Sequence, residues 1–256
     1  MGPYHGLLLI RATGHVALIF VLTVLTQLGG VAWGIALFFR RRLLVFMIAY
    51  VTLSVAAFWS APFFGRVALP CGSQGNLQVQ SGFYCALNRH YVTPKLKSVL
   101  IDFADDMARE FPGTVTEVLD ANFPFGTGFP LLPHVSHDDG EKADLAFYYR
   151  DRAGYLPGVT RSLIGYFAFE EGPTNCPVDT GLTLRWDMGW LQGLWPDYTL
   201  DPPRMRFALR WLGDEQRLGK IFIEPHLARR FDVSGPRIRF QGCRAARHDD
   251  HIHIQL

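Results

Sequence analysis

Apolar residues are concentrated in two long runs near the N-terminus, at residues 16–39 and 43–64. The first run has two threonines and Gln27 as its polar members, and the second carries no charge. At about 1.5 Å per helical residue, each run can cross a hydrocarbon layer of about 30 Å. The pattern therefore predicts two transmembrane helices within residues 1–65, and so a two-pass protein embedded in a lipid bilayer.

The link between the two runs is the basic triplet Arg40, Arg41 and Arg42. Basic residues favour the cytoplasmic side of a membrane, so the triplet predicts that both the N-terminus and everything after the second run lie outside the cytoplasmic membrane. Arg11, ahead of the first run, is a single opposing charge. The two predicted helices and the triplet between them would form a helical hairpin, which is interpreted as a membrane anchor.

The rest of the chain mixes helical and strand patterns. Thr93 with Pro94, and Asp201 with Pro202, form N-cap and first-turn pairs that predict two helices. Strands are predicted for short β-branched or apolar runs, at residues 114–119, 145–149, 220–224, 237–241 and the C-terminal segment. The expected fold is α+β, with a small antiparallel sheet and flanking helices in residues 93–256 and a linker over residues 66–92.

All four cysteines lie after the apolar runs, at positions 71, 85, 176 and 243. An even number in the part expected outside the membrane favours disulfides, with buried free thiols as the alternative. Three connectivities are open; pairing Cys71 with Cys85 would close a local loop inside the linker and leave Cys176 with Cys243.

The formal net charge is +2, and residues 1–65 contain no acidic residue. The remaining domain is close to neutral and has no basic stripe, which excludes a nucleic-acid-binding function. Nothing in the sequence predicts an oligomeric state.

The C-terminal segment contains three of the nine histidines, His248, His251 and His253. In a strand, alternate side chains share a face, so His251 and His253 would lie together with the neighbouring isoleucines on the other face. Two imidazoles side by side on a strand indicate part of a metal site, since imidazole is a common zinc ligand.

The best partners for these imidazoles are His137 and Asp144, spaced H-x6-D between a loop and the start of a strand. Together with one terminal histidine they would supply the three ligands of a catalytic Zn²⁺ site with an open fourth position. The remaining terminal histidine could then act as general base.

The pattern Ser136-His137-x-x-Gly140-x-x-x-Asp144 with a downstream His251-x-His253 resembles the zinc peptidases named for lysostaphin, D-Ala-D-Ala carboxypeptidases and hedgehog. Because His248 extends the tail to H-x-x-H-x-H, the chain looks most like the penicillin-insensitive murein endopeptidases. The resemblance implies His137, Asp144 and His253 as zinc ligands, His251 as catalytic base and His248 as an auxiliary group. It also implies hydrolysis of peptide bonds in peptidoglycan, with a peptidoglycan peptide as substrate.

Other interpretations remain open at this stage. Glu224 and His226 could compete as base or ligand, whereas His134 is interpreted as a neighbour of the site. A zinc-stabilised binding or scaffold domain without turnover is the main alternative to an enzyme. A second alternative makes the hairpin the functional part and the outer domain a sensor.

Overall fold

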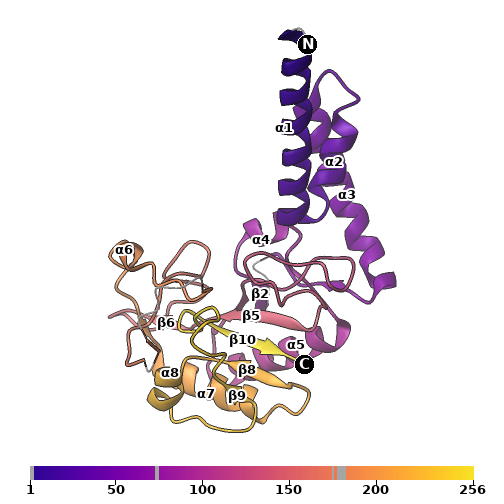
Figure 1. Cartoon of the computed structure of the whole chain (residues 1–256). Coiled ribbons are helices and arrows are strands. Elements are labelled where there is room, and N and C mark those ends of the chain that lie inside the picture. The colour runs from indigo at the N-terminus through magenta and orange to yellow at the C-terminus, as the bar shows by residue number, and fades with distance from the viewer. Residues whose placement is uncertain (1–2, 73–74, 175, 178–182) are drawn as a thin grey trace.

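The computed structural model describes residues 3–72, 75–174, 176–177 and 183–256. A helical stalk stands on a mixed α+β domain, with the N-terminus at the far tip of the stalk (Figure 1). The stalk consists of α1 (Pro3–Thr26), α2 (Gly29–Ala36) and α3 (Arg42–Ser60), which continues into the 3-10 turn η1 (Ala61–Phe64). Two segments are long and apolar enough to span a membrane, Leu9–Thr26 and Arg42–Phe64.

The run expected as one helix over residues 16–39 is two helices. The chain reverses at Gln27, whose φ is 64°, and α2 then returns along α1. Gly30 makes this close return possible, because a Cβ there would lie 1.8 Å from the Thr23 hydroxyl. With eight residues, α2 is too short to cross a membrane by itself.

The domain is organised around one six-stranded sheet with the order β2-β4-β5-β10-β8-β9. Its strands are β2 (Leu77–Val79), β4 (Thr116–Val118), β5 (Lys142–Ala146), β10 (His251–Gln255), β8 (Lys220–Phe222) and β9 (Ile238–Arg239). The expected small antiparallel sheet describes only the four central strands. The outer pairs β2–β4 and β8–β9 are parallel, because a helix lies between the strands of each pair in the chain.

The two predicted helices are α5 (Pro94–Glu110) and α7 (Pro202–Asp214). The Thr93 and Asp201 side chains cap them by accepting from the backbone N–H of Leu96 and Arg204. The two helices pack against each other beside the sheet (Figure 1). Their apolar faces join the sheet in one hydrophobic core, which includes the fully buried Ile252 and Ile254 of β10.

Residues 66–92, expected as a linker, belong to the domain. They form β2, the helix α4 (Gly82–Ala86) and the strands β1 (Val67–Ala68) and β3 (Tyr91–Val92), which pair with each other. The remaining elements are β6 (Tyr149–Arg150), its partner β7 (Thr199–Leu200), and the short helices α6 (Gly189–Gln192) and α8 (Pro225–Arg230).

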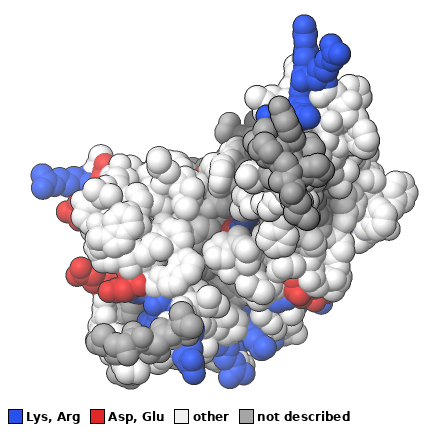
Figure 2. All heavy atoms as spheres, turned by 45° about the horizontal axis from the view of Figure 1, so that its top comes forward, with Lys and Arg blue, Asp and Glu red and all other residues white. Residues whose placement is uncertain are grey.

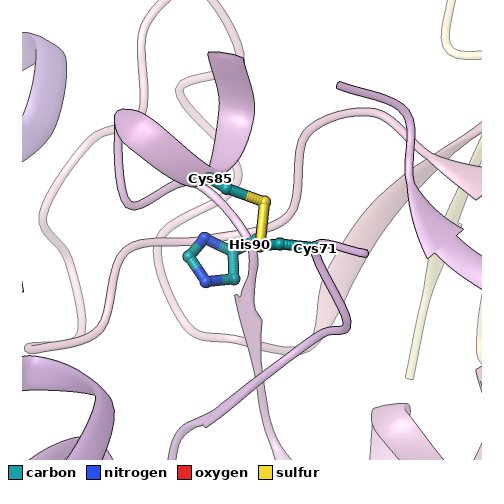
Figure 3. A group of neighbouring side chains, drawn as sticks. All are labelled: Cys71, Cys85 and His90. Carbon is teal, nitrogen blue, oxygen red and sulfur yellow. A yellow bond between two sulfur atoms is a disulfide. The ribbon is translucent and has the colours of Figure 1, made fainter. Parts of the chain in front are cut away.

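The disulfides Cys71–Cys85 and Cys176–Cys243 account for all four cysteines, which confirms the disulfide prediction. The first pins the segment before β2 to α4, beside His90 (Figure 3). Since both sulfurs are bonded to each other, this group of Cys71, Cys85 and His90 is not available as a metal site.

Candidate metal centre

The pairing of β5 with β10 places the predicted ligands on one face of the sheet. His253 lies directly opposite Asp144, and His251 lies opposite Ala146. Residues opposite each other in an antiparallel pair point to the same side, so both imidazoles share a face with the Asp144 carboxylate.

His137, Asp144 and His253 converge on one point. His137 Nε2 lies 3.1 Å from His253 Nδ1 and 3.4 Å from Asp144 Oδ1. His253 Nδ1 lies 2.8 Å from the same oxygen. Ligand atoms at tetrahedral positions around zinc, each about 2.0–2.1 Å from the ion, are about 3.3 Å apart. All three residues are buried. The three donor atoms are therefore close enough together to bind one metal ion.

Two hydrogen bonds fix the orientation of these groups. His137 Nδ1 donates to the Ala121 carbonyl at 2.7 Å, which leaves Nε2 as its ligand atom. The Tyr166 hydroxyl donates to Asp144 Oδ2, also at 2.7 Å. Burial raises the pKa of Asp144, but the surrounding imidazoles outweigh it and hold that pKa well below its usual range. Asp144 is therefore an ionised acceptor.

His134, which the sequence suggested only as a neighbour, belongs to the cluster. Its Nδ1 lies 3.0 Å from Asp144 Oδ2 and 3.4 Å from Asp120 Oδ2. Ligand-capable atoms of His134, His137 and Asp144 all lie within 4.8 Å of one another. His134, His137 and Asp144 are therefore a second set of residues that could hold a metal ion. Spacing could have suggested this residue, since it lies three positions before His137.

His251 lies beside the triangle, with its Nε2 3.7 Å from Asp144 Oδ1. Its Nδ1 hydrogen-bonds the Asp250 carboxylate, so Nε2 is free to face the cluster. Burial lowers the pKa of His251, but the Asp144 and Asp250 carboxylates outweigh it and the pKa is raised. This geometry is suitable for a histidine that accepts a proton at Nε2.

His248 places a third imidazole beside those of His251 and His253. Its ring centre lies 4.9 Å from that of His251 and 5.7 Å from that of His253. Burial, reinforced by the two neighbouring imidazoles, holds the pKa of His248 well below its usual value. It is therefore a neutral ring that packs against the two residues at the cluster.

Glu224 and His226, the alternative pair, do not join this cluster. Both Glu224 carboxylate oxygens accept from the Arg185 guanidinium at 2.9 Å, and the residue precedes the short helix α8. His226 lies within α8 rather than on a strand. Glu224 is thus the counter-ion of an arginine.

Beside the cluster lies a cleft lined mainly by aromatic side chains. His134 and His251 form part of it, together with Tyr166, Phe167 and Trp186. The last three come from residues 150–218, a block without a recognisable motif. Tyr166 had no sequence signal, because a tyrosine in an irregular segment resembles any core tyrosine.

No family model and no curated protein matches the chain. The geometry of the cluster therefore carries the functional argument.

Proposed function

We propose that this chain is a membrane-anchored zinc metallopeptidase that cleaves peptide bonds of peptidoglycan outside the cytoplasmic membrane. The observation that carries the proposal is the buried triangle of His137, Asp144 and His253, with side-chain atoms 2.8–3.4 Å apart. Two nitrogens and one carboxylate oxygen are the donor set of a hydrolytic zinc site with an open position. The choice of peptidoglycan comes from the resemblance of this motif set to the murein endopeptidases.

Each residue has a distinct task in the proposed reaction. His137, Asp144 and His253 would hold the ion, which when bound would supply Lewis acidity to polarise a carbonyl and to activate water at neutral pH. His251, oriented by Asp250, accepts the proton of the attacking water at Nε2 and delivers it to the departing amine. His134 and Tyr166 hold the second oxygen of Asp144 in place.

The charge distribution of the stalk supports an outer location for the domain. Arg42 donates to His15 at 3.4 Å, and Arg11 lies one helical turn beyond His15 on α1. Arg11 therefore stands at the same end of the stalk as the triplet, remote from the domain, so the expectation that the N-terminus lies on the domain's side is wrong. Figure 2 shows basic side chains at this tip. Together with two disulfides, this favours a cytoplasmic tip and an oxidising environment for the domain.

The test uses the full chain purified in nanodiscs. Metal analysis should find about one zinc per chain, and His137→Ala or Asp144→Ala should remove it. His251→Ala should retain zinc but lose the ability to release peptides from peptidoglycan. If wild-type and His251→Ala both bind zinc and neither releases peptides, the domain is a zinc-stabilised binding module and the peptidase proposal is wrong.

A further inference from the structure

The loop between β4 and β5, which carries His134 and His137, is attached to the base of the stalk. The Gln27 side chain, at the turn between α1 and α2, pairs with the backbone of Phe125. Its amide donates to the carbonyl at 2.6 Å, and its oxygen accepts from the N–H at 3.1 Å. Arg66 donates to the adjacent Gly126 carbonyl at 3.0 Å. These bonds join the segment that leads to His134 and His137 directly to the stalk.

The cleft is also connected to the base of the stalk through side-chain contacts. Tyr50 of α3 donates to the Ala86 carbonyl of α4 at 2.6 Å. Tyr84 of α4 donates to the Ile164 carbonyl, and its ring contacts Tyr166 in the cleft. These contacts run from a membrane helix to the metal site through two short segments.

Large apolar side chains cover the neighbouring surface. Trp190 and Leu194, in and just after α6, are 78% and 68% exposed, and Leu163 is 89% exposed. Figure 1 places α6 and α4 at the height where the stalk meets the domain. Figure 2, which looks toward this side, shows a broad area without charged side chains and with charges along its edges. Exposed apolar patches with tryptophan are typical of a membrane interface.

The cleft is lined by the same apolar surface. Trp186 and Leu184 stand at its exposed side, and Trp186 stacks on Phe167 with ring centres 6.5 Å apart. Arg247 also lines the cleft, but its guanidinium is already paired with Asp249 and Asp187. The approach to the metal cluster is therefore aromatic and suits an apolar group next to the peptide.

We infer that this face rests on the bilayer that holds the stalk, and that the cleft takes a peptide carried on a lipid anchor. The inference about the substrate rests on the proposed peptidase function. The reaction remains hydrolysis: the amide C–N bond breaks, water adds hydroxyl to the acyl carbon and a proton to the amine. The exposed apolar side chains around the cleft, such as Trp186 and Trp190, would hold the lipid anchor while the peptide reaches His251 and the cluster.

The substrate class is tested with the full chain in nanodiscs and one peptidoglycan-derived peptide, either free or attached to a palmitoyl chain. The acylated form should have a kcat/KM at least tenfold higher. The double variant Trp190→Ser with Leu194→Ser should lose this preference while its rate on the free peptide is unchanged. Ile101→Ser is the matched control, since Ile101 is an exposed apolar residue of α5 that does not line the cleft, and should retain the preference.

Membrane contact is measured without turnover in protein labelled with 5-fluorotryptophan. In nanodiscs with spin-labelled headgroups, the ¹⁹F resonance of Trp190, assigned through Trp190→Phe, should broaden more than that of Trp211 on α7. Equal broadening overturns the membrane-facing surface. Equal cleavage of both peptides overturns the lipid-anchored substrate and leaves the peptidase standing. Cleavage of neither overturns the peptidase proposal and the substrate inference with it.

Discussion

Asp144 and His253 face each other across the β5–β10 ladder, with Nδ1 and Oδ1 2.8 Å apart. The register of one strand pair therefore determines the geometry of the proposed metal site. A slip by one residue would turn His253 into the core and Ile254 toward the cluster. Fold and site are specified by the same set of backbone hydrogen bonds.

Zinc should stabilise the wild-type domain. A ligand at a hundredfold excess over its Kd adds about 2.7 kcal/mol to the free energy of unfolding. We expect zinc to raise the Tm of wild-type protein stripped of metal with a chelator, and to leave the Tm of His253→Ala unchanged, measured by differential scanning fluorimetry. His226→Ala, outside the cluster, should keep the zinc-dependent increase; losing it would place the ion elsewhere.

Gly140 is expected to tolerate no side chain. Its φ is +83°, and a Cβ there would lie 1.3 Å from Arg66 Nη1. Gly140→Ala should therefore lower the free energy of unfolding by more than about 2 kcal/mol. Gly126→Ala is the matched control, because Gly126 also has a positive φ but open space around it, and should cost about 1 kcal/mol. Equal losses in a urea titration would contradict the packing explanation.

Gln27 should protect the site loop from opening. Gln27→Ala removes both hydrogen bonds to Phe125, each worth about 1 kcal/mol. Hydrogen exchange at the Phe125 amide should become at least roughly fivefold faster, since that amide loses its acceptor. The Gly128 amide donates to Asp138 instead and serves as an internal reference. Unchanged exchange at Phe125 would show that the stalk does not restrain this loop.

Glu117 should make stability depend on pH. Burial raises the pKa of this carboxyl to about 7, although its hydrogen bond from Gln78 lowers it in part. The fold favours the protonated form, so its contribution is present below pH 4.5, the unfolded pKa, and is lost as the pH rises toward 7. Glu117→Gln should therefore be more stable than wild type at pH 8 by about 2–3 kcal/mol and nearly equal at pH 4.5. Pulse proteolysis in urea at both pH values measures this; parallel pH profiles would refute it.

Local signals in the sequence predicted much of the domain. Caps at Thr93 and Asp201 located two helices, and the alternation of His251, Ile252 and His253 predicted a strand with one polar and one apolar face. Such features depend on neighbours in the chain. The convergence of His137, Asp144 and His253 could be predicted because a known motif spacing linked two segments that are distant in the sequence.

The parts that sequence reasoning missed depend on distant contacts. The turn at Gln27 lies within a continuous apolar run. Hydropathy shows that such a run is apolar, but it does not show where the chain reverses. The edge strand β2 has only three residues and pairs in parallel with β4 across a helical connection. His134 joins the cluster because Asp144 and Asp120 lie beside it, which its own segment does not indicate.

The position of β10 has a consequence for folding. It is the last strand in sequence order, yet it fills the middle of the sheet between β5 and β8. Until it inserts, both neighbours expose unpaired edges, and the contacts it makes span more than a hundred residues to β5. Folding should therefore be slow and prone to edge-to-edge aggregation before this step. Insertion then closes the core and brings His253 to His137 and Asp144, so the proposed metal site is complete only after this step.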